Sequence, residues 1–229
     1  MSGAERNQAG ARPGGRFPDV KAVAALTVNA GVALLLMWSG CGRGGKVERG
    51  PYAALGEVAA KATSSLLAGK GKLVLLVSEA DNNSATAVGV AVKAFNETLK
   101  QARGVQVAAT EAIKPAMAVA LSGAEPLTPE RFVELVSKHA AADALVSFVG
   151  VPRLTPAQIG RLPQPRPKIV AVVTYNPPTK ALFAQGVLQL AILARPAAAP
   201  SARTPVTSQE WFDANYQLVT AATAGSLPF

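Results

Sequence analysis

A group of polar side chains follows a fully apolar segment in the first half of the chain. Residues 72–84 read KLVLLVSEADNNS, and the apolar part, residues 73–77, is typical of a buried strand. Carboxylates and amides at the exit of such a strand can hydrogen-bond a hydroxyl-rich ligand or coordinate a hard cation such as calcium. Asp81, Asn82 and Asn83 also have the residue types that cap helices, which is the competing interpretation. The candidate ligand-binding residues here are Ser78, Glu79, Asp81, Asn82, Asn83 and Ser84.

Further polar residues follow the later apolar segments. Arg153, Tyr175 and Asn176 come after the third and fourth predicted strands, while Glu111 and Arg195 come after the second and fifth. Ligands of open parallel sheets bind at the carboxyl ends of the strands, so we expect Arg153, Tyr175 and Asn176 to complete the ligand-binding set. The Asn-Pro-Pro sequence at Asn176 is also typical of a turn that starts a helix, and Arg153 is also typical of a solvated loop cation.

Several kinds of catalysis lack the residues that they need. Cys41 and His139 are the only cysteine and histidine, which excludes an internal disulfide and a four-ligand Cys/His zinc site. The loop after residues 73–77 lacks the dinucleotide and phosphate-loop fingerprints. His139 is expected within a helix, away from the strand exits, which argues against a Ser-His-acid triad. We expect no catalytic residue, metal or cofactor, and a hydrolase using Glu79 or Asp81 is the least favoured alternative.

Five apolar segments alternate with helical patterns and must position these side chains. This alternation predicts an α/β fold: a three-layer, doubly wound, mostly parallel five-stranded sheet of the flavodoxin-like type, with its switch point beside the first strand. The strands are expected at residues 73–77, 105–109, 144–149, 169–173 and 188–193. The helices are expected at residues 51–67, 85–102, 115–121 and 178–185, after Thr128 and Thr155, and after Thr207, where the last helix includes Trp211, Phe212, Tyr216 and Val219.

Composition and charge limit the partners of this domain. Of the 229 residues, 49% are apolar and 16% are charged, which fits a folded chain with a sizeable core. The formal net charge is +9, but the basic residues are spread singly along the chain and aromatic residues make up only 5%. A nucleic-acid surface needs a clustered basic patch, so we expect no nucleic-acid partner. Attraction to an anionic lipid or an anionic polymer is compatible with the spread charge.

The N-terminal segment predicts membrane targeting. Residues 22–38 are nearly all apolar and follow Lys21, which fits a short membrane span or the core of a signal peptide. Ser39-Gly40-Cys41 resembles the end of a bacterial lipobox, and the resemblance implies a lipid on Cys41 as the first mature residue. The departure is Trp38, where the family usually has leucine or another aliphatic residue; the alternative is an ordinary thiol beside an uncleaved anchor helix.

These features divide the chain into three parts. We expect a signal peptide or membrane anchor over residues 1–40, a flexible tether over residues 41–50, and a single α/β domain over residues 51–229. All of these readings place the domain in the cell envelope, anchored to a membrane and facing the periplasm or the exterior.

The pattern of residues 72–196 resembles one lobe of a type I periplasmic binding protein, the family of receptors for sugars and other small solutes. The resemblance rests on KLVLLVSEADNNSATAVGVAVKAFNETLKQ, ADALVSFVG and PKIVAVVTYNPPTKALFAQGVLQLAILARP. The family has two lobes of similar size, whereas this chain has residues for one. The resemblance implies a membrane-tethered domain that binds a small, sugar-like polar solute or a protein partner. The alternative is a structural or assembly lipoprotein of the envelope without a small-molecule ligand.

Overall fold

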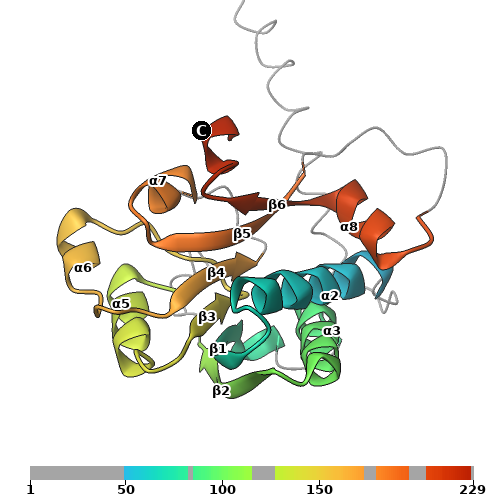
Figure 1. Cartoon of the computed structure of the whole chain (residues 1–229), viewed down its shortest axis with the longest axis horizontal. Helices are drawn as coiled ribbons and strands as arrows, with labels where there is room; N and C mark the ends of the chain where they lie inside the picture. The colour runs from blue at the N-terminus through green and yellow to red at the C-terminus, as the bar shows by residue number, and fades with distance from the viewer. Residues whose placement is uncertain (1–48, 82–84, 115–126, 173–178, 196–204, 228–229) are drawn as a thin grey trace, which may run out of the picture. The chain divides into compact units, whose positions relative to one another are not determined.

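A six-stranded sheet forms the middle layer of the domain (Figure 1). The computed structural model describes residues 49–81, 85–114, 127–172, 179–195 and 205–227. The strand order is β2-β1-β3-β4-β5-β6, in which the first five strands are parallel and β6 runs antiparallel to β5. The predicted α/β fold is therefore confirmed. The strands are β1 (Gly71–Ser78), β2 (Val105–Ile113), β3 (Ala144–Ser147), β4 (Lys168–Val172), β5 (Leu188–Ala194) and β6 (Tyr216–Thr220).

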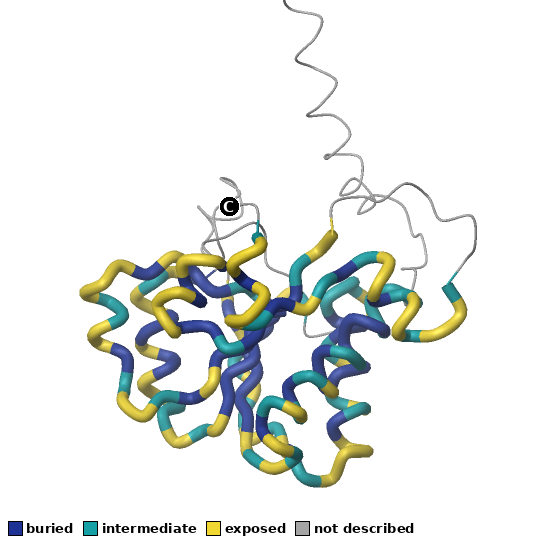
Figure 2. Tube along the Cα trace, turned by 45° about the horizontal axis from the view of Figure 1, so that its top comes forward, coloured by how far each residue is buried: buried dark blue, intermediate teal, exposed yellow. Residues whose placement is uncertain are grey.

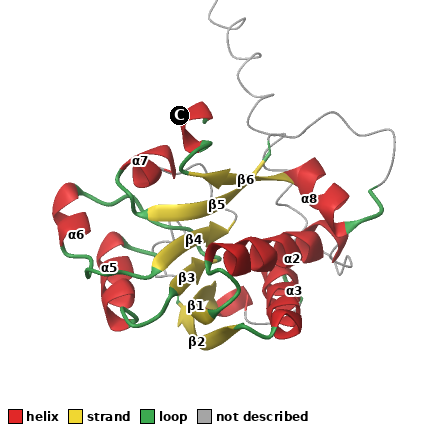
Figure 3. Ribbon diagram, viewed as in Figure 1, coloured by secondary structure: helices red, strands yellow, loops and turns green. Residues whose placement is uncertain are grey.

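Helices cover both faces of this sheet (Figures 2 and 3). One face carries α2, α3 and α8, and the other carries α5, α6 and α7. Two short 3-10 turns, η3 (Glu79–Asp81) and η4 (Ala224–Ser226), follow β1 and β6. The helices are α2 (Arg49–Leu66), α3 (Ala87–Ala102), α5 (Pro129–Lys138), α6 (Pro156–Gly160), α7 (Thr179–Ala184) and α8 (Ser208–Asn215). The first of these begins inside the segment that we expected to be the tether, residues 41–50.

The central strand β1 is buried on both faces because helices lie above and below it. Leu73, Leu75 and Val77 point into the core beneath α2, α3 and α8. Val74 and Leu76, which alternate with them, point into the core beneath α5 and α7. This is why the segment reads as a continuous apolar run instead of an alternating one.

Threonine side chains start four of the helices. Thr86, Thr128, Thr155 and Thr207 each accept a hydrogen bond from a backbone N–H in the first turn of the helix that follows. Each hydroxyl satisfies one of the N–H groups that have no partner within the helix. The starts predicted at Thr128, Thr155 and Thr207 are confirmed.

The prediction for the C-terminal helix is wrong beyond its second turn. The helix α8 ends at Asn215, and Tyr216 and Val219, which we assigned to its apolar face, belong to β6. The two residues are three positions apart, which suits one face of a helix, but in the strand their side chains enter opposite cores. The sheet therefore has a sixth strand that closes one edge.

The edge strand β2 is longer than predicted and contains a bulge. Leu73 of β1 lies opposite Val107 and Val74 lies opposite Ala109, so Ala108 is an extra residue. Glu111, predicted to lie in a loop after this strand, is inside it and lies opposite Leu76. Its loop assignment is wrong because the polar residues Thr110 and Glu111 continue the strand at the sheet edge.

Several expectations fall on parts of the chain that the structure does not describe. These are the apolar segment at residues 22–38, Cys41, the short helix at residues 115–121, and the strand-exit segment at residues 173–178. Among the described residues, no helix combines the length and the apolar character needed to cross a membrane.

Candidate functional site

The exits of β1 and β3 lie next to each other but lead to opposite faces of the sheet. After β1 the chain enters α3 on the face shared with α2, and after β3 it enters α6 on the other face. In open α/β sheets this arrangement is a topological switch point, where diverging loops leave a crevice beyond the carboxyl ends of the strands. The switch point predicted beside the first strand is present.

The exit of β1 carries two of the predicted carboxylates. Ser78 is the last residue of the strand and is partly buried, and Glu79 and Asp81 lie in η3 directly after it. Glu79 is exposed, and its Oε1 lies 3.6 Å from the Nζ of Lys114, which follows β2. This ion pair joins the exits of two neighbouring strands, and its exposure makes it worth at most about 1 kcal/mol. Lys114 was not among the predicted site residues.

The carboxylate of Asp81 does not cap the helix that follows. The N-cap residue of α3 is Thr86, whose hydroxyl accepts a hydrogen bond from the N–H of Gly89 at 2.9 Å. The interpretation of Asp81, Asn82 and Asn83 as the helix cap is therefore wrong, and a threonine further along the chain has that role. Asp81 is partly buried, and its carboxylate has no hydrogen bond or ion pair within the described part of the chain.

The exit of β3 packs into the core beneath the switch point. Phe148 follows the strand and donates its backbone N–H to the carbonyl of Leu76 in β1, at 2.9 Å. Its ring meets that of Phe95 from α3 edge-to-face, with 5.6 Å between the ring centroids. Ser147, which is fully buried, donates its hydroxyl to the carbonyl of Gly150 and folds the turn back on the strand end. Neither aromatic residue was predicted at the site, although Phe148 directly follows an apolar segment.

The remaining predicted site residues are brought together only in part. Arg153 is exposed in the connection between β3 and α6, and it forms no ion pair within the described ranges. Its position in the chain puts it beyond the carboxyl end of β3, but no contact links it to Glu79 or Asp81. The other predicted residues, Asn82, Asn83, Ser84, Tyr175 and Asn176, lie outside the described residues.

A buried hydroxyl lies at the start of α7, after the exit of β4. Thr179 is only 3% exposed, and its Oγ1 has no hydrogen-bond partner among the residues that the structure describes. Leaving such a group without a partner costs about 1–3 kcal/mol. The hydroxyl can donate one hydrogen bond and accept others, so it is a further polar group on the side of the sheet where the strands end. The sequence pattern placed a helix start here but gave no sign that Thr179 is buried.

A second polar cluster lies on the edge strand, away from the switch point. The Oε1 of Glu111 is 2.7 Å from the Nζ of Lys138 and 2.8 Å from the Nε2 of His139. The hydrogen bond from Lys138, followed by that from His139, holds the pKa of Glu111 below its ordinary value. The helix α5 ends at Lys138, so His139 follows the helix instead of lying within it as predicted.

This cluster and the carboxylates of the switch point do not form a metal site or a triad. The partner of His139 is Glu111, and no serine hydroxyl contacts it within the described residues. In the same part of the chain, no group of three His, Cys, Asp or Glu side chains could hold a metal ion. The arrangement at the switch point offers carboxylate acceptors at the strand exit, above a buried aromatic pair.

Comparison with known proteins gives likenesses at the level of structure alone. The sequence matches no protein-family model and no curated protein. Similar solved structures include an arabinose-binding protein from Geobacillus stearothermophilus, at 14% identity and a TM-score of 0.49, with 76% of this chain and 62% of that chain covered. A glucose-galactose-binding protein from the same organism is 14% identical with a TM-score of 0.47, and the match covers 78% of this chain and 62% of that chain. A sugar-binding protein of a sugar ABC transporter from Bacillus halodurans is 15% identical with a TM-score of 0.47, and the match covers 76% of this chain and 64% of that chain.

The three compared structures are those of sugar-binding proteins. This chain spans less than two thirds of the length of each of them. At identities of 14% to 15% the likeness concerns the fold, and it places no individual residue of this chain in a binding site.

Proposed function

We propose that this domain binds a small, hydroxyl-rich solute such as a sugar at the switch point between β1 and β3. The observation that carries the proposal is the exit of β1, where the carboxylates of Glu79 and Asp81 follow the strand while Thr86 caps the helix. Because helix capping does not use Asp81, its carboxylate is available to accept hydrogen bonds from ligand hydroxyl groups. Hydrogen bonds to an ionised acceptor are stronger than those between neutral groups.

The surroundings of these carboxylates support a sugar-like ligand. A sugar presents hydroxyl groups at its rim and C–H groups on its faces, and its binding sites combine a few polar groups with apolar walls. At the switch point the buried Phe95–Phe148 pair packs beneath the strand exits and supports them, and Ser78 adds a hydroxyl at the strand end. Asn82, Asn83, Ser84, Arg153, Tyr175 and Asn176 are the remaining proposed contacts, and Thr179 joins them on the strength of its unpaired hydroxyl.

The proposal includes the location of the domain. A lipid on Cys41, or an apolar helix over residues 22–38, would hold the chain to a membrane, with the domain in the periplasm or on the exterior. The support is the sequence pattern before the described domain, which begins at Arg49. A single lipid chain holds a protein only weakly, so stable attachment through Cys41 requires more than one chain or a second contact.

Calorimetric titration of the detergent-solubilised full-length chain with pentoses and hexoses tests the binding proposal. Sugar concentrations up to about 10 mM detect binding free energies as small as roughly 3 kcal/mol. We expect the double variant E79Q/D81N to bind the best sugar at least tenfold more weakly. The control E97Q/D213N makes the same two changes at exposed positions on α3 and α8 and should bind like the wild type.

Two outcomes would contradict the proposal. If the wild-type chain binds no sugar in this range, the envelope protein without a small-molecule ligand becomes the better account. If E79Q/D81N and E97Q/D213N bind equally well, the exit of β1 is not the binding site. Intact-mass analysis of membrane-extracted protein tests the anchor, which requires a chain that begins at a lipidated Cys41 or one that retains residues 22–38.

A further inference from the structure

The turns at the amino ends of the strands form one continuous edge on the side of the sheet opposite the candidate site. The N–H of Gly71 donates to the carbonyl of Gly104 at 3.1 Å, which joins the starts of β1 and β2. The N–H of Lys72 donates to the Oδ2 of Asp143 at 2.7 Å, which joins β1 to β3. The N–H of Lys168 donates to the carbonyl of Asp143 at 3.0 Å, which joins β3 to β4. Four neighbouring strands thus begin along one line.

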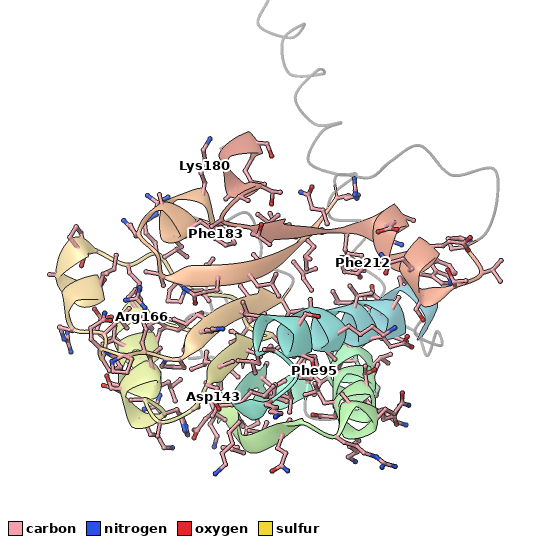
Figure 4. The ribbon with its side chains drawn as sticks, viewed as in Figure 1. Phe95, Asp143, Arg166, Lys180, Phe183 and Phe212 are labelled. Carbon is pink, nitrogen blue, oxygen red and sulfur yellow. The ribbon has the colours of Figure 1, made fainter. Side chains whose placement is uncertain are left out.

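Six basic side chains gather along this edge, although they are far apart in the sequence. Each lies in a helix-to-strand connection, in the last turn of the helix before it, or in the first two residues of the strand after it, and all helices between parallel strands end on this side of the sheet. Five of the six are exposed, and Arg166 is partly buried. In Figure 4, Arg166 and Asp143 lie beside the starts of β4 and β3. We call this set the basic rim: Lys70, Lys72, Lys100, Arg103, Arg166 and Lys168.

The charge of the basic rim is only partly neutralised by its neighbours. Asp143 is the one carboxylate in these connections, within the described residues. Lys168 donates to the carbonyl of Leu66 at 2.7 Å and Arg166 donates to that of Gly186 at 2.6 Å, but a bond to a neutral carbonyl leaves the cation charged. The C-termini of α2, α3, α5, α6 and α7 each add a partial charge of roughly −0.5. Together with Asp143 they offset somewhat more than half of the six formal positive charges, so the basic rim keeps a net positive charge.

The opposite edge of the sheet carries a smaller excess of positive charge. At the carboxyl ends of the strands, the carboxylates of Glu79 and Asp81 accompany four cations, Lys114, Arg153, Lys180 and Arg195, whereas the rim has six cations and one carboxylate; Glu79 and Lys114 pair directly. The positive net charge of the described domain is therefore concentrated on the basic rim, on the side away from the candidate solute site. Such asymmetry raises the local concentration of polyanions near one surface.

We propose that the basic rim binds an anionic polysaccharide. The cations follow the starts of neighbouring strands, which are spaced about 4.8 Å apart, so they form a row that suits a linear polyanion. Among the described residues no aromatic side chain is exposed, so the rim offers no platform on which nucleic-acid bases could stack. Binding would therefore depend on charge and would weaken as salt increases.

Affinity measurements with heparin as the probe test this proposal. The full-length chain in a non-ionic detergent is titrated with heparin between 50 and 200 mM salt, with neutral dextran as the ligand control. The rim variant K70Q/K72Q/K100Q removes three exposed cations that have no ion-pair partner in the described part of the chain. The matched variant K61Q/K93Q/R131Q removes the same charge from helix surfaces. Thermal melting of both variants checks that the fold is retained.

We expect the rim variant to bind heparin on the order of tenfold more weakly at 50 mM salt, with a shallower salt dependence, and the matched variant to lose less than about threefold. Equal losses in the two variants would show that only net charge matters and would overturn the proposal. A 20-base-pair DNA duplex, and mixed micelles containing phosphatidylglycerol, are measured in parallel. Tighter binding of either one than of heparin would overturn the assignment to a polysaccharide. Sugar titrations of the rim variant should be unchanged, which separates this test from that of the solute site.

Discussion

The contact between α2 and α3 makes a strong prediction about Gly56. A β-carbon added to this residue would lie 2.0 Å from the carbonyl oxygen of Ala91 and 2.9 Å from the backbone nitrogen of Phe95. Both are backbone atoms of α3, so no side chain can rotate away to make room. An ordinary contact begins near 3.4 Å, so α2 would have to move about 1.4 Å away from α3.

This movement determines the expected loss of stability in G56A. A gap of 0.5–1 Å already removes about a quarter to a half of the dispersion energy of a contact. The buried side chains of α2 beside Gly56, including Leu55 and Ala59, would lose contacts of this kind. We expect a cost of about 3–4 kcal/mol, reduced by about 1 kcal/mol because alanine favours the helix. The net loss of about 2–3 kcal/mol corresponds to a fall in Tm of roughly 5–10 °C.

Thermal and urea denaturation followed by circular dichroism measure this loss. The control is G160A, in the last turn of α6, where an added β-carbon meets no atom within 4 Å and the backbone is not left-handed. We expect G160A to be as stable as the wild type or slightly more stable. If G56A is also as stable as the wild type, the close approach of the two helices is wrong.

Two further predictions concern polar groups. E111Q should lose about 1 kcal/mol of unfolding free energy at pH 7. The folded pKa of Glu111 is lowered, so its stabilising contribution is present above pH 4.5 and disappears as pH falls through the folded pKa. Urea denaturation from pH 7 to 3 should show the unfolding free energies of E111Q and the wild type converging. A difference that stays constant with pH would contradict this cause. T179V removes the unpaired hydroxyl and should raise stability by up to about 1 kcal/mol while weakening sugar binding. T63V, at the other buried hydroxyl without a partner, should stabilise similarly but leave sugar binding unchanged, and equal sugar affinity in both variants would remove Thr179 from the site.

The parallel core of the fold was predictable because its strands are buried on both faces. A segment such as Leu73–Val77 admits few other structures when it is followed by a helix with a clear apolar stripe. The edge strands were harder to predict because one side of each lies against solvent. In β6, Tyr216 and Val219 are spaced like residues on one face of a helix, and the pairing with β5 that makes them a strand is a tertiary contact.

The location of the candidate site was predictable, but the roles of its residues were not. The polar segment after β1 was found from residue types alone, and its position follows from the parallel sheet. Asp81 was also interpreted as a helix cap because aspartate favours that position, whereas Asp81 ends η3 and Thr86, further along the chain, caps α3. The basic rim had no signal in the sequence because its cations come from separate connections that only the topology aligns.

The bulge in β2 has a consequence for changes in chain length. Ala108 has no partner in β1. If it were deleted, the residues after it would keep their present partners in β1, and the strand would simply lose its bulge. Deletion of Ala108 would therefore leave Glu111 facing α5 and Ile113 opposite Ser78. A deletion almost anywhere else in the sheet would turn the following side chains to the wrong layer. The edge of this domain therefore contains a position where natural variation can shorten a strand without exchanging its inner and outer faces.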